Sequence, residues 1–221
     1  MNVIDLLRGL PRNCDHGEKW FESENYYPML ASFSREFNPK SILEVGVRSG
    51  YSAISFLSEC DADLYVGLDY QKYIVNSNSD AACNLEFFRN TSGKNLNFEL
   101  VTVDTQFMSD LGFLAGRSFD LVYVDGDHSE IGAFNDLCNF WGVLNVGGHL
   151  LVDDSVLVAV RCAIKRFLTI VNEPNYEVAT HKGTWVMSKT REFSFPLMSK
   201  PNYNGTYLAP DGSYITLTDS K

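Results

Sequence analysis

Short apolar runs alternate with longer segments of helical periodicity along most of this chain. Five runs have the length and the β-branched or aromatic content of buried strands: residues 41–45, 64–68, 98–103, 119–124 and 149–152. Apolar positions recur at helical spacing over four other segments: residues 51–59, 80–90, 131–141 and 156–171. This alternation predicts an α/β fold, in which a mostly parallel sheet carries helices on both faces.

Two further β-prone segments close the pattern. Residues 176–180 and 184–188 flank the polar turn His181-Lys182-Gly183, which predicts an antiparallel hairpin. Before the first strand, residues 20–37 predict an aromatic-rich helix. We therefore expect three parts, which are a helical cap (1–40), a core (41–190) and a C-terminal appendage (191–221). The appendage contains residues that favour extended or hairpin structure: Pro196, Pro201 and the turn Pro210-Asp211-Gly212.

Length, charge and cysteine content narrow the class of protein. At 221 residues the chain suits one domain with a full core, and 45% hydrophobic residues without a long uncharged apolar run predict no membrane span. Residues 1–12 lack the layout of a signal peptide, and five scattered cysteines fit reduced thiols, so we expect a cytoplasmic protein. A net charge of −10 without a Lys/Arg cluster argues against nucleic acid as substrate, whereas a homo-oligomer stays open.

A glycine-spaced turn follows the first predicted strand. Gly46 allows a sharp turn close to a ligand, and Gly50 lets the next helix begin near the strand. The spacing G-x-x-x-G with Glu44 two residues earlier differs from the dinucleotide pattern G-x-G-x-x-G. It resembles the first motif of the class I S-adenosylmethionine-dependent methyltransferases, which implies a cofactor contact at Glu44, Gly46, Gly50, Tyr51 and Ser52. The alternative is a tight βα turn without a ligand.

Acidic residues follow the next two strands at the edge where an open parallel sheet binds its ligand. Asp69 can accept hydrogen bonds from both ribose hydroxyls of a nucleotide, and Asp104 can accept from an adenine amino group. Each could instead cap a helix, because Asp is favoured at that position. We expect both residues in the cofactor site.

Three more carboxylates follow the fourth and fifth strands. Asp125, Asp153 and Asp154 should converge on one small volume, where like charges would repel unless a cation neutralises them. Hard oxygen ligands favour Mg²⁺, with Mn²⁺ or Ca²⁺ as replacements. The alternative is that Asp154 or Ser155 caps the next helix. For Asp127 we favour a structural role in the turn.

A more specific resemblance rests on these strand ends. The run Asp125-Gly126-Asp127-His128-Ser129, followed by Gly147-Gly148 and Asp153-Asp154, resembles metal-dependent O-methyltransferases of the catechol and macrolide-sugar types. The likeness covers about residues 41–188 and implies the Rossmann-like methyltransferase fold, with seven strands and a closing antiparallel hairpin. It also implies that Asp125, Asp153 and Asp154 hold Mg²⁺, and we expect Asp125 to serve the cofactor and catalysis as well.

Departures from that pattern bear on the base and the substrate. His128 stands where the catechol type has a lysine base, and an imidazole titrates near neutral pH, so we expect His128 to be the general base. Asp154 in place of an asparagine is closer to the sugar-modifying branch, whereas Glu130 replaces a common aromatic residue and leaves the substrate class open. The other histidines, His16, His149 and His181, are assigned structural roles, with His149 at the start of a strand.

Together these features predict Mg²⁺-dependent O-methylation of a small molecule or sugar. The reaction would be attack of a substrate hydroxyl on the methyl group of S-adenosylmethionine, with the hydroxyl held by the metal. Two alternatives stay open. One is a nicotinamide-dependent oxidoreductase, which the missing third glycine and the closing hairpin disfavour, and the other is a non-catalytic cofactor-binding module with a structural acidic cluster.

Overall fold

The computed structural model describes residues 2–12, 26–70, 77–106, 108–180, 182–192, 206–208 and 214–216. It divides into two compact units, Met1–Val103 and Asp104–Lys221, which are described separately. Several residues of the sequence-based predictions lie outside the described ranges: residues 20–25 of the predicted helix, Cys14, His16, His181 and the prolines of the appendage.

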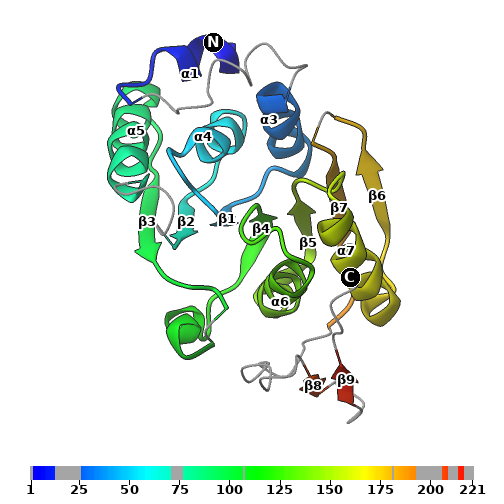
Figure 1. The fold of residues 1–221 in the computed structure, drawn as a ribbon. Helices are drawn as coiled ribbons and strands as arrows, with labels where there is room; N and C mark the ends of the chain where they lie inside the picture. Colours follow the sequence, from blue (N-terminus) through cyan, green and yellow to red (C-terminus); the bar gives the residue numbers. More distant parts are fainter. Residues whose placement is uncertain are drawn as a thin grey trace. The chain divides into compact units, whose positions relative to one another are not determined.

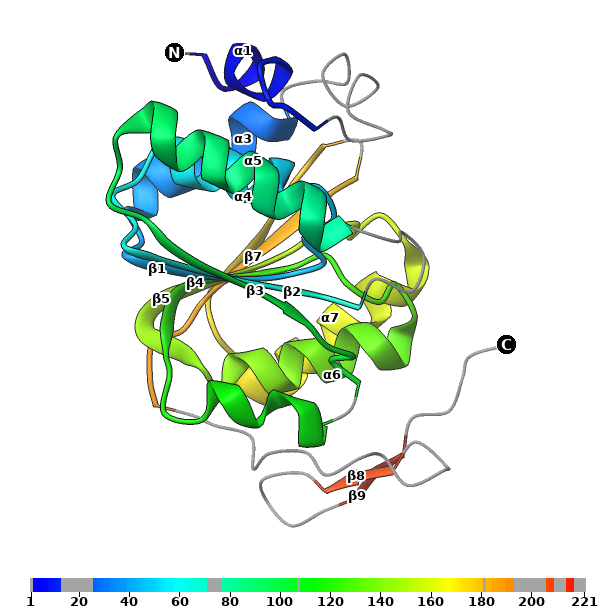
Figure 2. The same cartoon turned by 90° about the vertical axis from the view of Figure 1, so that its left-hand side faces the viewer.

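The first unit contains three parallel strands in the order β3-β2-β1. The strands are β1 (Ser41–Val45), β2 (Leu64–Asp69) and β3 (Asn97–Thr102). The described helices are α1 (Val3–Arg8), α3 (Tyr26–Phe37), α4 (Tyr51–Ser58) and α5 (Ser77–Ser92), and α3, α4 and α5 lie along one face of these strands (Figures 1 and 2). Because α4 and α5 connect successive strands, the carboxyl ends of β1 and β2 meet at one edge.

The second unit contains four strands in the order β4-β5-β7-β6. Its elements are η1 (Met108–Leu114), β4 (Phe119–Val124), α6 (Glu130–Trp141), β5 (Leu144–Val152), α7 (Val158–Val171), β6 (Asn175–Val178) and β7 (Thr184–Ser188). Strands β4 and β5 are parallel, whereas β7 runs antiparallel to both β5 and β6. Helices α6 and α7 pack against each other, with the Trp141 and Phe167 rings 5.4 Å apart (Figure 1).

The predicted fold class is confirmed. The two units supply the seven strands of a mostly parallel, Rossmann-like sheet with antiparallel strands at its end. The tail also contains a short hairpin of β8 (Thr206–Leu208) and β9 (Tyr214–Thr216), and none of the described helices is long and apolar enough to cross a membrane. The four described cysteines are free thiols, as expected.

Some element boundaries differ from the predictions. Strand β5 begins at Leu144, so His149 lies inside the strand and not at its start. Gly147-Gly148 belongs to this strand, where Gly147 has a left-handed φ of 85° and a Cβ on Gly148 would lie 2.8 Å from the carbonyl oxygen of Asp120. The predicted 20–37 helix begins at Tyr26 within the described residues, and α1 and η1 were not predicted.

Gly67 in β2 provides a test of this packing. A Cβ at Gly67 would lie 2.6 Å from Cγ2 of Val47, 2.8 Å from Cδ2 of Leu100 and 2.9 Å from the hydroxyl of Tyr65. We expect Gly67→Ala to lower the free energy of unfolding by about 1–3 kcal/mol, the usual cost of overpacking. Urea denaturation measures this. Gly112→Ala is the control, since a Cβ on Gly112 would meet no atom within 4 Å, and equal effects of both variants would contradict the prediction.

Candidate active site

The glycine turn after β1 has the backbone conformation that the sequence predicted. Gly46 and Gly50 have φ angles of 91° and 77°, in the left-handed region that favours glycine. Arg48, between them, also has a positive φ of 50°, and its backbone N–H donates to Oδ2 of Asp69 at 2.8 Å. The backbone N–H of Gly46 donates to the carbonyl of Leu68 at 2.8 Å. The turn and Asp69 therefore lie side by side at the carboxyl edge of β1 and β2.

Glu44 is fully buried, and neighbouring side chains donate hydrogen bonds to its carboxylate. Its carboxylate accepts hydrogen bonds from the Ser52 hydroxyl and, at 2.6 Å, from the Tyr65 hydroxyl. Burial, together with the Glu44 charge, raises the pKa of Tyr65, so this phenol stays a donor. Glu44 thus ties the first turn of α4 to two strands, a function that the sequence did not indicate.

The side chain of Tyr51 also belongs to the interior of the first unit. Its ring lies 5.9 Å from that of Tyr27, and its hydroxyl donates to the carbonyl of Arg12 at 3.3 Å. Tyr51 is the first residue of α4, so its backbone N–H belongs to the group that a helix start leaves without intrahelical partners.

In the second unit, Asp104 shapes the loop that begins the unit. Its Oδ1 accepts the backbone N–H of Gln106 at 3.0 Å, and the Gln106 side chain donates to Oδ1 of Asp136 on α6 at 3.2 Å. Asn135 donates to Oε1 of Gln106 at 2.7 Å. Burial raises the pKa of Asp136 to about 7. The sequence did not indicate this network, although Asp136 lies among apolar residues of a predicted helix.

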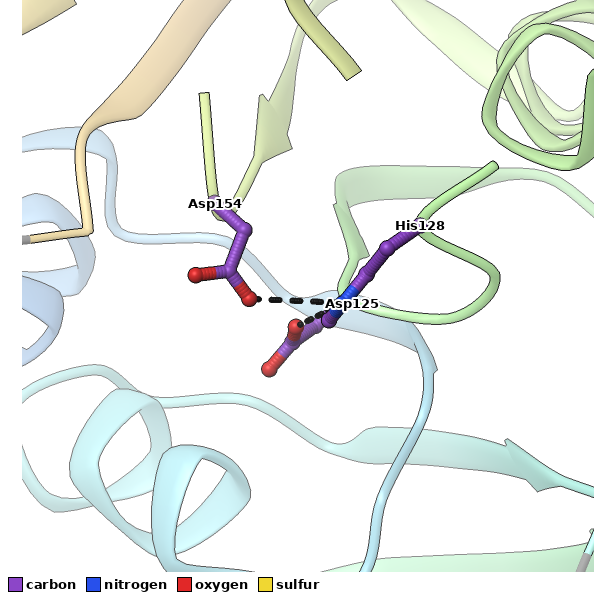
Figure 3. Close-up of side chains that lie close together, drawn as sticks. All are labelled: Asp125, His128 and Asp154. Atoms are coloured by element: carbon purple, nitrogen blue, oxygen red, sulfur yellow. Dashed lines mark hydrogen bonds and ion pairs between the residues drawn. The ribbon is translucent and has the colours of Figure 1, made fainter. Parts of the chain in front are cut away.

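The ends of β4 and β5 bring predicted site residues together, as Figure 3 shows. Nε2 of His128 lies 3.3 Å from Oδ1 of Asp125 and 3.3 Å from Oδ2 of Asp154. The backbone supports this approach, because the N–H of Asp153 donates to the carbonyl of Val124 at 3.0 Å. The structure therefore brings Asp125, His128 and Asp154 together.

Asp153 is the most deeply buried carboxylate beside these residues. Its side chain is fully buried, bonds to Nζ of Lys182, and accepts from the Thr184 hydroxyl at 3.4 Å. Lys182 also lies 3.3 Å from Oδ2 of Asp154 and 3.6 Å from Oδ2 of Asp125. The sequence analysis placed Lys182 only in a polar turn and missed this position. We call Asp125, His128, Asp153, Asp154 and Lys182 the strand-end cluster.

Exposure rises across the strand-end cluster from its interior to the solvent. The side chains of Asp153 and Lys182 are 0% and 10% exposed, Asp154 and Asp125 are 14% and 21% exposed, and His128 is 44% exposed. His128 is thus the member that an incoming molecule can reach most easily.

The charges of the cluster shift one another's proton affinities. Hydrogen bonding to Asp125 raises the pKa of His128, against the effect of partial burial, and Asp154 adds to the rise. Burial alone would lower the pKa of Lys182, but the surrounding carboxylates raise it, so the ammonium is charged at neutral pH. Burial and the neighbouring charge of Asp125 raise the pKa of Asp153 to about 7, while Lys182 opposes that rise.

Capping explains one acidic residue but not the others. Oδ1 of Asp127 accepts the backbone N–H of Ser129 at 2.8 Å, as expected for a structural role in the turn. The N-cap of α7 is Leu157 and has no side-chain hydrogen bond, so the alternative that Asp154 or Ser155 caps this helix is wrong. Asp154 instead has a left-handed φ of 53°, a strained conformation for a non-glycine residue that is often found at functional sites.

Comparisons with known proteins identify relatives of the fold. A family model described as a methyltransferase domain matches residues 43–155. TomG from Streptomyces achromogenes, an O-methyltransferase involved in tomaymycin synthesis and solved with S-adenosylmethionine (SAM), is similar, with 17% identity, a TM-score of 0.60, and 86% of this chain and 91% of that chain covered. The Bacillus cereus O-methyltransferase in complex with S-adenosylhomocysteine (SAH) has 14% identity, a TM-score of 0.61 and the same coverage of 86% and 91%.

A third similar structure is the SAH-bound methyltransferase PaMTH1 from Podospora anserina, with 16% identity, a TM-score of 0.60 and coverage of 86% of this chain and 89% of that chain. At these identities the solved structures establish the fold alone. No curated protein sequence matches the chain.

Proposed function

This chain belongs to the methyltransferase-domain family, and from that premise we propose that it transfers the methyl group of SAM to a hydroxyl oxygen of a small molecule, such as a sugar. The observation that carries the proposal is the position of His128 at the solvent side of the strand-end cluster, bonded to Asp125. A neutral imidazole there can accept the proton that a hydroxyl must lose during methyl transfer. The methyltransferase family disfavours the nicotinamide alternative, and solved O-methyltransferases of the same fold support transfer to oxygen.

The residues of the first unit fit SAM. Gly46 and Gly50 bring no side chains to the turn after β1, and Asp69 offers a carboxylate at the same edge for ribose hydroxyls. SAM supplies an activated methyl group when bound, which leaves as a cation equivalent from sulfur. We propose that Gly46, Gly50, Asp69 and the backbone N–H groups of Tyr51 and Ser52 bind it, and that Glu44 holds α4 in place.

The second unit holds the other residues to which we assign roles. We propose that Asp104 contacts the adenine, since its Oδ1 already holds the loop and the carboxylate retains further acceptor capacity. Asp125 orients His128, so that the imidazole presents a basic nitrogen to the acceptor hydroxyl. His128 would take the proton of that hydroxyl during the transfer, and Asp125 and Asp154 would stabilise the protonated ring.

The predicted Mg²⁺ site does not fit this geometry. Asp125, Asp153 and Asp154 converge on Nζ of Lys182, so an ammonium group already occupies the position between them that an ion would need. Asp125, His128 and Asp154 do bring three ligand atoms within 4.8 Å of one another. However, this set includes an imidazole, which Mg²⁺ does not favour, and its oxygens face an ammonium group. The proposed mechanism therefore has no metal step. The effect of chelation on turnover tests the magnesium prediction.

Direct binding and turnover test the proposed function. Titration calorimetry should detect SAM and SAH binding but no binding of NAD⁺. Incubation with methyl-labelled SAM and a panel of phenols, alcohols and sugars should then transfer label to an oxygen of at least one acceptor. Binding of NAD⁺ in place of SAM would overturn the proposal, and SAM binding without transfer to any acceptor would favour a non-catalytic module.

Asp69 provides a sharper test of the SAM site. Asp69→Ala removes a charge-assisted contact to ribose, so we expect SAM affinity to fall by about 1.5–3 kcal/mol in calorimetry. Because Asp69 also accepts the N–H of Arg48, Asp69→Asn is the matched control: it keeps an acceptor for the turn but loses the charge. We expect Asn to retain the fold and to bind SAM with intermediate affinity. If Asp69→Ala binds SAM with unchanged affinity, Asp69 is not part of the SAM site.

A further inference from the structure

The turn that carries Lys182 is fastened to the end of β5. Strand β7 pairs antiparallel with β5, with Trp185 opposite Val152, so the turn before β7 lies beside the carboxyl end of β5. Two backbone hydrogen bonds fix it there: the N–H of Ser155 donates to Gly183 at 3.2 Å, and that of Val156 donates to Lys182 at 3.0 Å. The position of the Lys182 backbone is therefore set by the sheet itself.

The Lys182 ammonium occupies the place where a cation would balance the three carboxylates. It contacts one oxygen of each of Asp125, Asp153 and Asp154, two at 3.6 Å and 3.3 Å and the third in a short hydrogen bond. Only 10% of its side chain is exposed, so it cannot swing into water without leaving buried Asp153 uncompensated. A metal ion bound by the same three carboxylates would meet the ammonium at van der Waals distance and be repelled by it.

We propose that Lys182 is a built-in cation that replaces the divalent metal ion at this site. Lys182 neutralises part of the carboxylate charge, and it fixes Asp125 and Asp154, which in turn hold His128. Lys182 is thus a positioning residue and not a catalytic one. The expectation for turnover, that methyl transfer by this chain needs no divalent cation, rests on the proposed function. The expectation for metal binding is independent of the proposed function, because metal binding can be measured without an acceptor or SAM.

The test measures Mn²⁺ binding to chelator-dialysed protein by electron paramagnetic resonance and calorimetry. The wild type should show no bound Mn²⁺ at this site up to about 1 mM. Lys182→Met removes the charge but keeps an unbranched apolar side chain of similar length. This variant should bind one Mn²⁺ at least about tenfold more tightly than the wild type, and Asp154→Asn in the same background should abolish the gain.

The control is Lys165→Met on the exposed surface of α7, which should leave Mn²⁺ binding as in the wild type. One Mn²⁺ bound by the wild type and lost in Asp154→Asn would overturn the proposal, and so would a folded Lys182→Met variant that gains no affinity. If Lys182→Met does not fold, Lys182→Gln replaces it. The Mn²⁺ measurement on the wild type tests the proposal without any variant of Lys182.

A separate readout is the effect of EDTA on the wild-type reaction. Once an acceptor has been found, turnover should be unchanged after chelation, and its loss with recovery on Mg²⁺ addition would overturn the proposal. If no acceptor is found at all, the proposed function fails while the Mn²⁺ measurements still decide the role of Lys182.

Discussion

Replacement of His128 by alanine is expected to lower kcat by about 10²–10⁴, the usual contribution of a positioned general base. The reason is that no other basic nitrogen of the strand-end cluster is available: Lys182 is a charged ammonium buried against Asp153, whereas His128 is 44% exposed. SAM affinity should be unchanged, because the variant affects the proton in the transition state and not the cofactor. Single-turnover rates and SAM calorimetry on the same preparations measure both effects.

His128→Gln distinguishes a base from a structural residue. Its amide nitrogen can take the place of Nε2 and still donate to Asp125, but it cannot accept a proton, so we expect nearly the same loss of kcat as with alanine. The pH profile gives a second check. Asp125 and Asp154 raise the pKa of His128 and Lys182 opposes them, so the ring is protonated and inactive to higher pH than an ordinary histidine. In wild type, kcat should rise with pH through that pKa, and this limb should disappear in both variants. If kcat falls by less than about fivefold and still rises with pH in the variants, His128 has a structural role and is not the base.

The pattern of apolar runs was sufficient to predict the order and type of the main elements. Strands β1, β2 and β4 are short buried segments, so local periodicity and tertiary burial agree there, whereas β3 and β6 are mostly exposed or half-buried. The start of β5 was misplaced because Gly147-Gly148 is typical of a turn. Within the strand, Gly148 is needed because the backbone at Asp120 comes too close for a side chain, a long-range contact that local sequence does not reveal.

The strand-end rule likewise predicted part of the site. Asp125 and Asp154 follow parallel neighbours, and His128 is three residues beyond Asp125, so their approach follows from local sequence and parallel pairing. Asp125, Asp153 and Asp154 do converge, but on Nζ of Lys182, whose place beside them was not predicted.

The position of Lys182 beside the carboxylates could have been predicted in part from the sequence. The predicted hairpin placed it in a turn, and the carboxylate repulsion called for a cation. What was missing was the pairing partner of the last strand. Only when β7 lies antiparallel beside β5 does the turn come to the carboxyl edge, and that choice depends on contacts across the sheet.

The buried carboxyl of Asp136 should make the protein less stable at higher pH. Burial raises its pKa from 3.8 to about 7, so the folded state holds this proton more tightly than the unfolded state. The contribution of this proton to the free energy of unfolding is therefore fully present below about pH 4 and is lost as the pH rises through 7. Between about pH 5 and 8 this single group should cost about 2–3 kcal/mol of unfolding free energy.

Asp136→Asn removes that proton and keeps an oxygen that can accept the Gln106 hydrogen bond. Relative to wild type, the variant should therefore gain about 2–3 kcal/mol between about pH 5 and 8 in urea denaturation curves. Asp61→Asn is the control, because the Asp61 side chain is 82% exposed and its replacement should leave the pH dependence unchanged. If wild type and Asp136→Asn lose stability in parallel over this range, Asp136 is ionised in the folded protein at pH 5 and its burial is compensated by donors beyond Gln106.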